Sequence, residues 1–314
     1  MQPAGARPPV VWDVVGVGAN AVDLVSVVAE YPTRVGPSSK IRVRRQFVSC
    51  GGQTANAMAT CARLGLRAAY VGAVGSDHHG RLLREALAAR AVDTTHLVTR
   101  DAKNQFAVII LDEASGERVI LWDRDERLLL EPAEVPDGMI QSARLLHVDD
   151  VDEGAAIRAA RIARGAGVPV TSDIDHLGGR TEELIAAVDV AIFDEYLPAR
   201  LTGAGNLEDA LRLLRHTHTG LLCATRGARG AIAIEEDRIC VSPGFKVAAV
   251  DTTGAGDVFR GGFIYGRLQG WPMDQVLDFA NAAAAISCTR LGAMQGIPAL
   301  AEVRAMLMTG ERTS

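Results

Sequence analysis

Short, β-branched apolar runs alternate along most of this chain with longer segments of helical period. The apolar runs that indicate buried strands lie at residues 14–17, 69–74, 145–148, 168–171, 188–193 and 221–225. The segments of helical period lie at residues 55–64, 80–89, 155–165, 182–187, 207–215, 257–268 and 273–288. Strands that alternate with helices predict an α/β fold, in which helices cover both faces of a doubly wound, mostly parallel sheet.

Two stretches depart from this alternation. Residues 20–48 contain alternating polar and apolar positions without a helical period, and residues 104–123 indicate a hairpin with its turn at residues 112–116. We expect both stretches to form antiparallel strands outside the main sheet. They would make a small β-sheet lid over the carboxyl edge of the parallel strands, where open α/β sheets bind ligands.

Composition excludes several classes of function. The 314 residues carry a formal net charge of −5, and aromatic residues make up only 4%. The basic face and aromatic stacking platforms of a nucleic-acid-binding protein are therefore not expected. No apolar stretch approaches the ~18 residues that a membrane span requires, and the first residues lack the apolar core of a signal peptide. We therefore expect neither nucleic acid nor membrane as a partner.

Cysteine usage favours a reducing compartment. The cysteines are odd in number, widely scattered and never in C-x-x-C spacing, so the pattern predicts neither a disulfide framework nor a zinc site. They lie at Cys50, Cys61, Cys223, Cys240 and Cys288. A cytoplasmic protein is the natural expectation.

The strongest chemical signal is the sequence from Asp251 to Asp257, which reads DTTGAGD. We expect a strand at residues 245–250 before it and an apolar helix after it. The small residues Gly254, Ala255 and Gly256 would let backbone N–H groups face an anion at a helix N-terminus. Asp257 beside them could accept a proton from a hydroxyl, which is the combination that phosphoryl transfer to an alcohol needs. The alternative is a strand–helix turn in which an aspartate is only a cap.

A second signal is the sequence from Gly51 to Asn56, which reads GGQTAN. Paired glycines, Gly51 and Gly52, permit close approach of a ligand to the backbone. The Asn56 amide, one turn into the following helix, can donate to and accept from vicinal sugar hydroxyls. The alternative is a glycine turn followed by an asparagine on a helix surface.

A third signal follows the first expected strand. Gly16 and Gly18 imitate a dinucleotide fingerprint, but residues 34–38 lack the acid expected ~20 residues later, so hydride chemistry is not supported. Asp23 instead follows these glycines closely in the sequence, so its carboxylate could bind a substrate hydroxyl at the end of a strand. The alternative for Asp23 is a solvated acid in a turn.

A fourth signal is the loop at residues 225–230, which contains Thr225, Gly227 and Gly230 after an apolar run. The loop could hold the phosphate or ribose of a nucleotide, or it could be a plain hairpin turn. The chain has no G-x-x-x-x-G-K-[ST] motif and none of the protein-kinase signatures, so neither a P-loop enzyme nor a protein kinase is supported.

Together these motifs resemble the ribokinase-like, or PfkB-type, carbohydrate kinases over about residues 12–308. One signature of that family is similar to the stretch from Gly51 to Gly80, and the other to the stretch from Asp251 to Gly262. The resemblance implies one kinase domain over residues 12–308, with a three-layer ribokinase-like fold. The lid segments at about 20–48 and 104–123 would be inserted in it.

The resemblance also implies roles for individual residues. Asp257 would be the catalytic base, with Gly254, Ala255 and Gly256 as the anion hole. The acceptor sugar would lie against Asp23, Gly51, Gly52, Gln53 and Asn56. ATP, carrying Mg²⁺, would lie near Thr225, Gly227, Gly230 and Asn281. Family members that use potassium bind it near residues matching Asp251, Thr253, Ser287, Arg290 and Gly292, although Gly296 here replaces a residue whose hydroxyl often helps.

One departure from the family concerns its N-x-x-E motif. This chain has Asp194-Glu195-Tyr196-Leu197, so Leu197 occupies the glutamate position and Asp194 is left as the candidate Mg²⁺ contact. Ketohexokinases also depart from this motif. They resemble the chain further in their glycine–asparagine sugar motif and in a lid arginine that matches Arg118. The alternative for Arg118 is a surface arginine paired with Glu113 or Glu117.

These observations predict an ATP-dependent kinase that phosphorylates a hydroxyl of a small sugar, of keto-hexose or ribose type. Two alternatives stay open: a nucleoside kinase of the same fold, and a non-catalytic sugar-binding regulator. The projecting lid strands 106–111 and 118–122 have too little chain to bury both faces, so we also expect a homodimer that forms through the lid.

Overall fold

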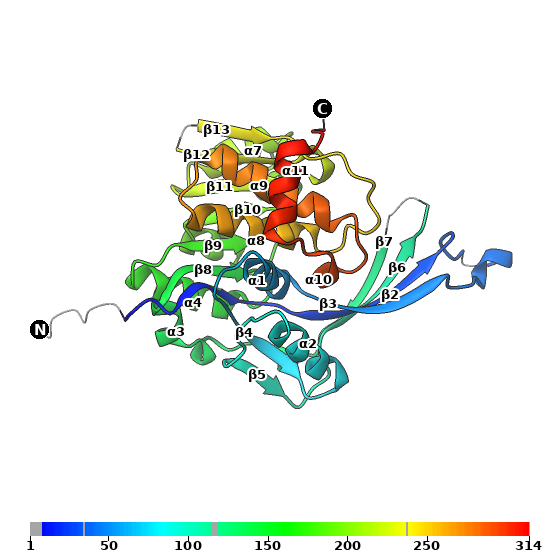
Figure 1. Cartoon of the computed structure of the whole chain (residues 1–314). Coiled ribbons are helices and arrows are strands. Elements are labelled where there is room, and N and C mark those ends of the chain that lie inside the picture. The colour runs from blue at the N-terminus through cyan, green and yellow to red at the C-terminus, as the bar shows by residue number, and fades with distance from the viewer. Residues whose placement is uncertain (1–7, 34, 115–117, 237, 314) are drawn as a thin grey trace, which may run out of the picture.

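A computed structural model of the chain describes residues 8–33, 35–114, 118–236 and 238–313. Its framework is a nine-stranded sheet, from one side of which a four-stranded sheet projects (Figure 1). In spatial order the strands of the large sheet are β13 (Arg238–Ser242), β12 (Ala231–Glu235), β11 (Leu221–Thr225), β10 (Val190–Phe193), β9 (Val170–Asp173), β8 (Ala143–Asp149), β1 (Trp12–Val17), β4 (Ala68–Gly75) and β5 (Leu97–Arg100).

Strand direction divides the large sheet into two parts. Neighbouring strands from β11 to β5 are parallel, whereas β12 and β13 form an antiparallel end. Because parallel neighbours direct their carboxyl ends to one edge, β1, β8, β9, β10 and β11 all deliver their following loops to the same side of the molecule. The candidate site lies at that edge.

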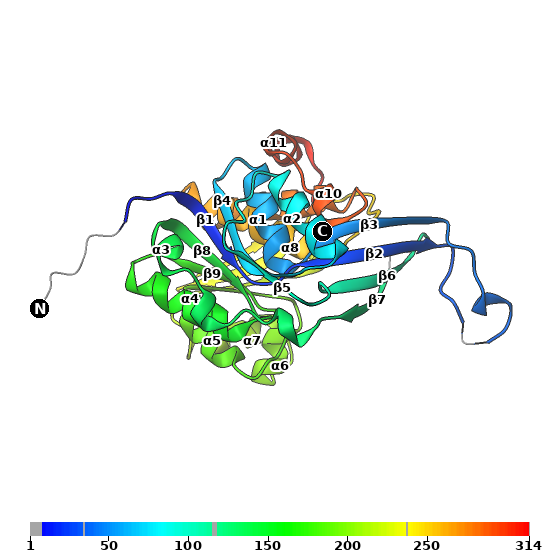
Figure 2. The same cartoon turned by 90° about the horizontal axis from the view of Figure 1, so that it is seen from below.

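Helices cover both faces of this sheet (Figure 2). One layer contains α3 (Asp137–Gln141), α4 (Glu153–Gly165), α5 (Thr181–Ala187), α6 (Leu197–Thr202) and α7 (Leu207–Leu214). The other contains α1 (Gln53–Arg63), α2 (His78–Ala88), α8 (Ala255–Leu268), α9 (Met273–Ser287), α10 (Ala293–Gly296) and α11 (Leu300–Thr309). The predicted three-layer α/β architecture is confirmed.

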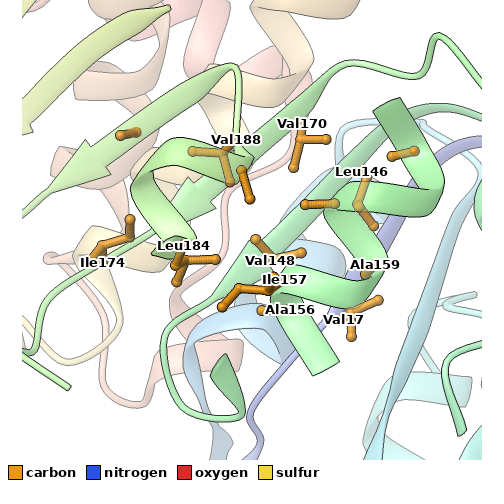
Figure 3. Packing of buried hydrophobic residues seen from close by; sticks show 14 of the residues in the cluster. Val17, Leu146, Val148, Ala156, Ile157, Ala159, Val170, Ile174, Leu184 and Val188 are labelled. Carbon is orange, nitrogen blue, oxygen red and sulfur yellow. The ribbon is translucent and has the colours of Figure 1, made fainter. Parts of the chain in front are cut away.

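Small side chains bring helix and sheet into close contact in the first of these layers. Ala156 and Ala159 of α4 lie on the side of that helix that faces Val148 of β8 and Val17 of β1 (Figure 3). Ile157 is fully buried in the same cluster. Truncation of such a residue to alanine typically costs 2–5 kcal/mol, so this layer fixes β8 and the loop that follows it.

The projecting sheet has the order β3 (Arg45–Gly51), β2 (Ala21–Val28), β6 (Phe106–Asp112) and β7 (Arg118–Asp123). Three of its strands fall within the two segments expected to form a lid, and β3 begins in the first segment and continues to Gly51, beyond its expected end at 48. Strand β2 is parallel to β6 and both outer pairs are antiparallel. Residues 115–117 of the expected hairpin turn lie outside the described residues. The inward face contains Val25, Ile109 and Leu111, which pack against Leu291, just before α10.

The strand expected at residues 245–250 does not form. Phe245 makes a single antiparallel bridge with Arg312, and the N–H of Val250 donates to the carbonyl of Cys288 at 2.7 Å. The segment is held from two sides by chain that lies outside the sheet, so it has no strand neighbour to pair with.

Among the described residues, no helix combines the length and apolar character needed to span a bilayer.

Candidate active site

The first turn of α8 carries a carboxylate at the carboxyl edge of the sheet. Asp257 is half-buried there, and Asn56 of α1 donates a hydrogen bond from Nδ2 to its Oδ2 at 2.7 Å. The two residues are about 200 positions apart in the sequence, so they meet because α1 and α8 pack side by side. The helices thus bring the second and the first sequence signals into contact.

The environment of Asp257 favours its protonated form. Burial raises the pKa of its carboxyl to about 7, opposed by the Asn56 hydrogen bond and by the cationic Arg260. The nearby carboxylates of Asp175 and Asp23 raise the pKa further. A carboxyl with a pKa near neutrality is suited to accept a proton at physiological pH.

Backbone geometry before Asp257 opens an anion site. Gly254 adopts φ = +76°, and a Cβ there would lie 2.7 Å from the Cβ of Ala293, so only glycine fits. The N–H of Ala255 donates to the Thr252 carbonyl at 3.3 Å, while the structure records no partner within the described residues for the N–H groups of Gly254 and Gly256. Such N–H groups at a helix start attract negative charge.

The loop is fixed by Asp251, which is buried. Its Oδ1 accepts from the N–H of Thr253 and its Oδ2 from the N–H of Gly292, both at 2.9 Å. Asp251 therefore ties the DTTGAGD loop to the start of α10. This explains structurally why an acid begins the motif.

Asp23 faces the glycine pair across β2 and β3. A Cβ on Gly51 would lie 2.7 Å from Asp23 Oδ2, and a Cβ on Gly52 would lie 2.3 Å from the Cα of Asn20. Gly52 also has φ = +100°. Burial, with the neighbouring Asp251, raises the pKa of the Asp23 carboxyl to about 7. Gly51 is thus needed for the backbone to approach this buried acid, and Gly52 for the close approach to the backbone of Asn20.

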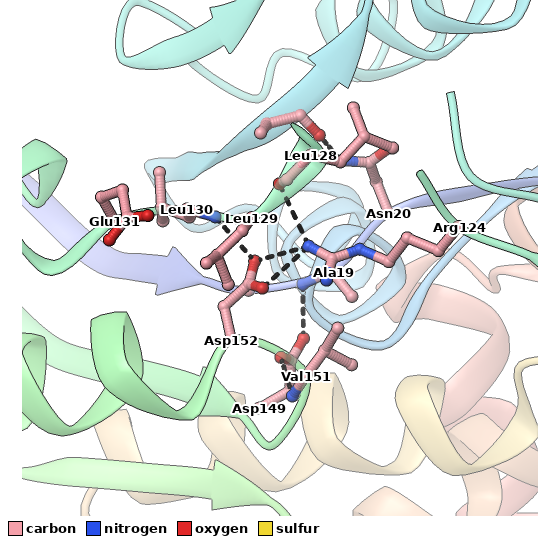
Figure 4. A network of polar contacts seen from close by, with 12 residues as sticks. Ala19, Asn20, Arg124, Leu128, Leu129, Leu130, Glu131, Asp149, Val151 and Asp152 are labelled. Carbon is pink, nitrogen blue, oxygen red and sulfur yellow. Dashed lines mark hydrogen bonds and ion pairs between the residues drawn. The ribbon is translucent and has the colours of Figure 1, made fainter. Parts of the chain in front are cut away.

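A polar network beneath this region holds the turn after β1 (Figure 4). Asp149, at the end of β8, accepts from the N–H of Ala19 at 2.6 Å and from Thr54 Oγ1 at 2.7 Å. Arg124 binds both carboxylate oxygens of Asp152 at 2.8 Å. The network fixes the start of α1, and with it Asn56. Beside it, Gln53 Nε2 lies 3.5 Å from Asp150 Oδ1.

A cavity of about 640 Å³ opens beside the first turn of α8. It is lined by the 225–230 loop, by α8 and α9, by the 244–249 segment and by the lid. The sequence-predicted residues on its wall are Thr225, Gly227, Gly230, Ala255, Gly256, Asn281 and Arg118. The loop is therefore both a hairpin connection, between the antiparallel strands β11 and β12, and part of a pocket wall. Asn281 uses its Nδ2 within the protein, donating to Ser242 Oγ at 2.8 Å.

Arg118 reaches from β7 of the lid to the DTTGAGD loop, where its Nη1 donates to Thr252 Oγ1. Glu113, one of its predicted surface partners, lies 3.9 Å from Arg44 instead, and Glu117 lies outside the described residues. Arg118 also contributes a positive charge that lowers the pKa of Asp23. It therefore stands between the cavity and the Asp23 region.

Comparisons with known proteins agree with this geometry. Residues 13–300 match the model of the "pfkB family carbohydrate kinase". The chain belongs to the pfkB family of carbohydrate kinases. It is a phosphotransferase that acts on a sugar hydroxyl, which confirms the predicted recognition and enzyme class.

Individual relatives cover nearly the whole chain. A ribokinase of Haemophilus influenzae is 29% identical over 288 residues, covering 89% of this chain and 92% of the relative. An ATP-dependent ribose-1-phosphate kinase of Halopiger xanaduensis is 33% identical over 254 residues, with coverages of 80% and 84%. The crystal structure of a ribokinase from Thermotoga maritima superposes with a TM-score of 0.80 at 25% identity, over 95% of this chain and 100% of the other.

Three of the residues expected near metal ions, Asp194, Ser287 and Arg290, already have partners within the protein. Asp194 Oδ1 accepts from the N–H groups of Tyr196 and Leu197, at 3.1 and 2.7 Å, and Leu197 is fully buried in the core. Ser287 Oγ donates to the Ala284 carbonyl, and Arg290 pairs with Glu302. No group of three or more potential metal ligands occurs within the described part of the chain.

Sequence reasoning missed a charged cluster beneath Asp257. Arg260, a single turn after Asp257, forms ion pairs with Asp173 at the end of β9 and with Asp175 just beyond it. The available signal was the position of these acids directly after a predicted strand, at the ligand-binding edge of a parallel sheet.

Proposed function

We propose that this kinase transfers the γ-phosphoryl group of ATP to a hydroxyl of a small sugar, of keto-hexose or ribose type, with Asp257 as general base. The observation that carries the proposal is the position of Asp257. It lies directly after the N–H groups of Gly254 and Gly256, and Asn56 binds its Oδ2 at 2.7 Å. A base and an anion site thus occupy adjacent positions at one helix start.

The reaction follows from these groups. Asp257 removes the proton of the acceptor hydroxyl as the hydroxyl oxygen attacks the γ-phosphorus, and the bond from that phosphorus to the bridging oxygen of ADP breaks. Charge on the transferring phosphoryl oxygens is met by the N–H groups at residues 254–256 and by the α8 dipole. Because the N–H of Ala255 also faces the Thr252 carbonyl, Gly254 and Gly256 are expected to contribute most.

The acceptor is expected to lie between the lid and α1. Asp23 and Asn56 supply side-chain oxygen and nitrogen atoms for sugar hydroxyls. Gly51 forms the backbone wall beside Asp23, Gly52 lies against the backbone of Asn20, and Gln53 directs its side chain to Asp150. A buried acid and an amide at neighbouring positions suit a ligand with vicinal hydroxyls. Arg118 extends this wall toward the phosphate.

The cavity beside the anion site is proposed as the ATP site. Thr225, Gly227, Gly230 and Asn281 line it, and its inner end reaches Gly256. The name of the Halopiger xanaduensis relative gives ATP as the phosphoryl donor of that enzyme, which supports the same donor here. We propose that Mg²⁺ arrives with the nucleotide and touches Asp194 through water, since magnesium keeps several waters and binds phosphates readily.

A monovalent cation is proposed near the Asp251 loop. Thr253 Oγ1 is buried and has no hydrogen-bond partner among the described residues, while Asp251 carries a charge beside it. With Ser287, Arg290 and Gly292, these residues mark the loop that a potassium ion would order. Comparison of activity in potassium chloride and in tetramethylammonium chloride tests this cation site, and equal rates would refute it.

We further propose that residues 12–308 form one kinase domain with lid segments inserted near residues 20–48 and 104–123. The enzyme is expected to be cytoplasmic, where ATP is available. Its five cysteines, all within the described residues, are free thiols, which supports a reducing compartment.

A homodimer through the lid is expected because Val119 and Leu121 of β7 are exposed.

An acceptor screen with Mg-ATP tests the proposal. ADP release is measured across pentoses, hexoses, keto-sugars and nucleosides, with Asp257→Asn as the control for contaminating activity. Turnover of a keto-hexose or ribose supports the proposal. Preference for a nucleoside would establish the alternative acceptor class, and sugar binding without any ADP release would indicate a regulator.

A further inference from the structure

Arg260 is among the largest fully buried side chains of the described structure, with 2% of its surface exposed. A guanidinium stays charged in proteins, so its burial requires partners of opposite charge. Its Nη2 lies 2.6 Å from Asp173 Oδ1 and 2.8 Å from Asp175 Oδ1. This guanidinium therefore joins α8 to the carboxyl end of β9.

The other end of the guanidinium points toward the anion site. A Cβ on Gly256 would lie 2.7 Å from Arg260 Nη1, so the arginine packs directly beneath the residue that precedes the base. Asp257 lies three positions before Arg260, and residues at that spacing share one face of a helix. The same cation thus underlies Gly256 and neighbours Asp257.

We infer that Arg260 is a positioning residue for the catalytic base, holding the start of α8 against β9 and offsetting the carboxylates that surround Asp257. The inference rests on the proposed function, because it assigns Arg260 a task in that same reaction. It differs from the role of a purely structural ion pair, which would stabilise the fold without affecting ionisation of the base.

The charge balance around Asp257 makes the inference testable. The charged and polar groups that face this carboxyl come from α1, β2, the end of β9 and α8, and they are Asn56, Asp23, Asp173, Asp175 and Arg260. Arg260 is the one cation of this set. Its charge favours the ionised form of Asp257, while Asp175 and Asp23 oppose it.

Two substitutions should therefore move the ionisation of Asp257 in opposite directions. Arg260→Met removes the cation, so the acidic limb of the kcat/KM profile should move about one pH unit upward. Asp175→Asn removes a competing carboxylate and leaves the Arg260–Asp173 pair in place, so the limb should move downward. Arg260→Met should also lower kcat at least tenfold, with both KM values within about threefold. Arg260→Lys should restore part of the loss.

Arg267→Met is the matched control, since Arg267 lies on the same helix and pairs with Glu235 at the surface. It should leave kcat and the pH profile unchanged. If Arg260→Met does not fold, as judged by circular dichroism, Asp175→Asn carries the test, and Arg260→Lys, which keeps the positive charge, should leave the limb in place. The inference would be overturned if the acidic limbs of Arg260→Met and Asp175→Asn moved in the same direction, or if neither limb moved.

A second readout separates this inference from the proposed function. The carboxyl carbon of Asp257 is titrated by NMR in ¹³C-labelled wild type and variants, and Asp257→Asn identifies its signal. Opposite shifts of this titration would support the role of Arg260 even if no sugar were phosphorylated. Unchanged titration in an active kinase would reject that role while leaving the kinase proposal intact.

Discussion

Asn56 Nδ2 lies 2.7 Å from Asp257 Oδ2, so a residue of the glycine motif directly holds the carboxylate of the DTTGAGD motif. The contact fixes the orientation of Asp257 and favours its charged form, because hydrogen bonding to a carboxylate lowers its pKa. The acceptor region and the proposed base are therefore one connected unit. The predictions below follow from that unit and from the lid above it.

The buried acid Asp23 should make the protein less stable as the pH rises. Its carboxyl has a pKa of about 7 in the folded protein and about 3.9 when unfolded. The folded state therefore binds more protons between these values, and the free energy of unfolding should fall as the pH rises from about 4 to 7. At pH 8, Asp23→Asn should increase the free energy of unfolding by up to about 4 kcal/mol, at ~1.4 kcal/mol per pKa unit.

Urea unfolding at pH 5 and pH 8 measures this effect. Asp13→Asn is the control, because the pKa of Asp13 is lowered by its hydrogen bonds to Arg67, and its loss should destabilise at both pH values. An Asp23→Asn variant that is equally or less stable than wild type at pH 8 would contradict the prediction. The KM of the Asp23→Asn variant for the sugar should nonetheless rise, because the sugar loses a charged partner.

Arg118 should act in phosphoryl transfer and acceptor binding. It contacts Thr252 and lines the cavity beside Gly256, so Arg118→Ala should reduce kcat/KM for the sugar at least tenfold with the ATP KM little changed. Steady-state kinetics in both substrates, at unchanged thermal stability, measure this. Arg44→Ala is the control, because that lid arginine faces Glu113 at the surface. Constants within twofold of wild type would make Arg118 a surface residue.

The lid should form a homodimer through its outer face. Val48, Leu24, Val108 and Leu121 follow one another across the four strands, and Leu121 is 57% exposed. Leu121→Asp should therefore convert a dimer to monomers in light scattering at tens of micromolar. Leu177→Asp, at a comparably exposed position outside the lid, should not. A monomeric wild type would refute this interface.

Activity should require Mg²⁺ or Mn²⁺ that binds together with the nucleotide. Leu197 is buried and cannot bind a metal, and Asp194 Oδ1 already caps the start of α6. Calorimetry should detect no tight Mg²⁺ binding to the protein alone, whereas chelation of the metal should abolish turnover. Tight binding without nucleotide would show that the protein carries its own metal site.

Periodicity and motif chemistry predicted much of this molecule from the sequence. The parallel strands, the lid strands and the helices expected at 55–64 and 257–268 follow from local pattern, although these helices begin two residues earlier, at Gln53 and Ala255. The 245–250 segment was predicted wrongly as a strand because its apolar residues face the cavity and its backbone pairs with residues 288 and 311. Distant pairing of this kind leaves no local pattern.

The charged cluster beneath Asp257 shows a second limit of sequence reasoning. Arg260 lies in an apolar helix, and Asp173 ends a buried strand, so neither has a neighbour in sequence that reveals the ion pair. Only the packing of α8 on β9 brings them together. The contact of Arg118 with Thr252 could likewise not be predicted from the sequence, because it depends on how the lid is placed over the main sheet.

The most direct test of the account is the turnover of Asp257→Asn with the best sugar from the acceptor screen. The variant keeps the shape of the side chain and its contact with Asn56 but cannot accept a proton. We predict a decrease in kcat of roughly 10²–10⁴, the usual contribution of a general base, with ATP affinity and thermal stability nearly preserved. A variant that retained more than half of the wild-type kcat would contradict the assignment of Asp257 as the base.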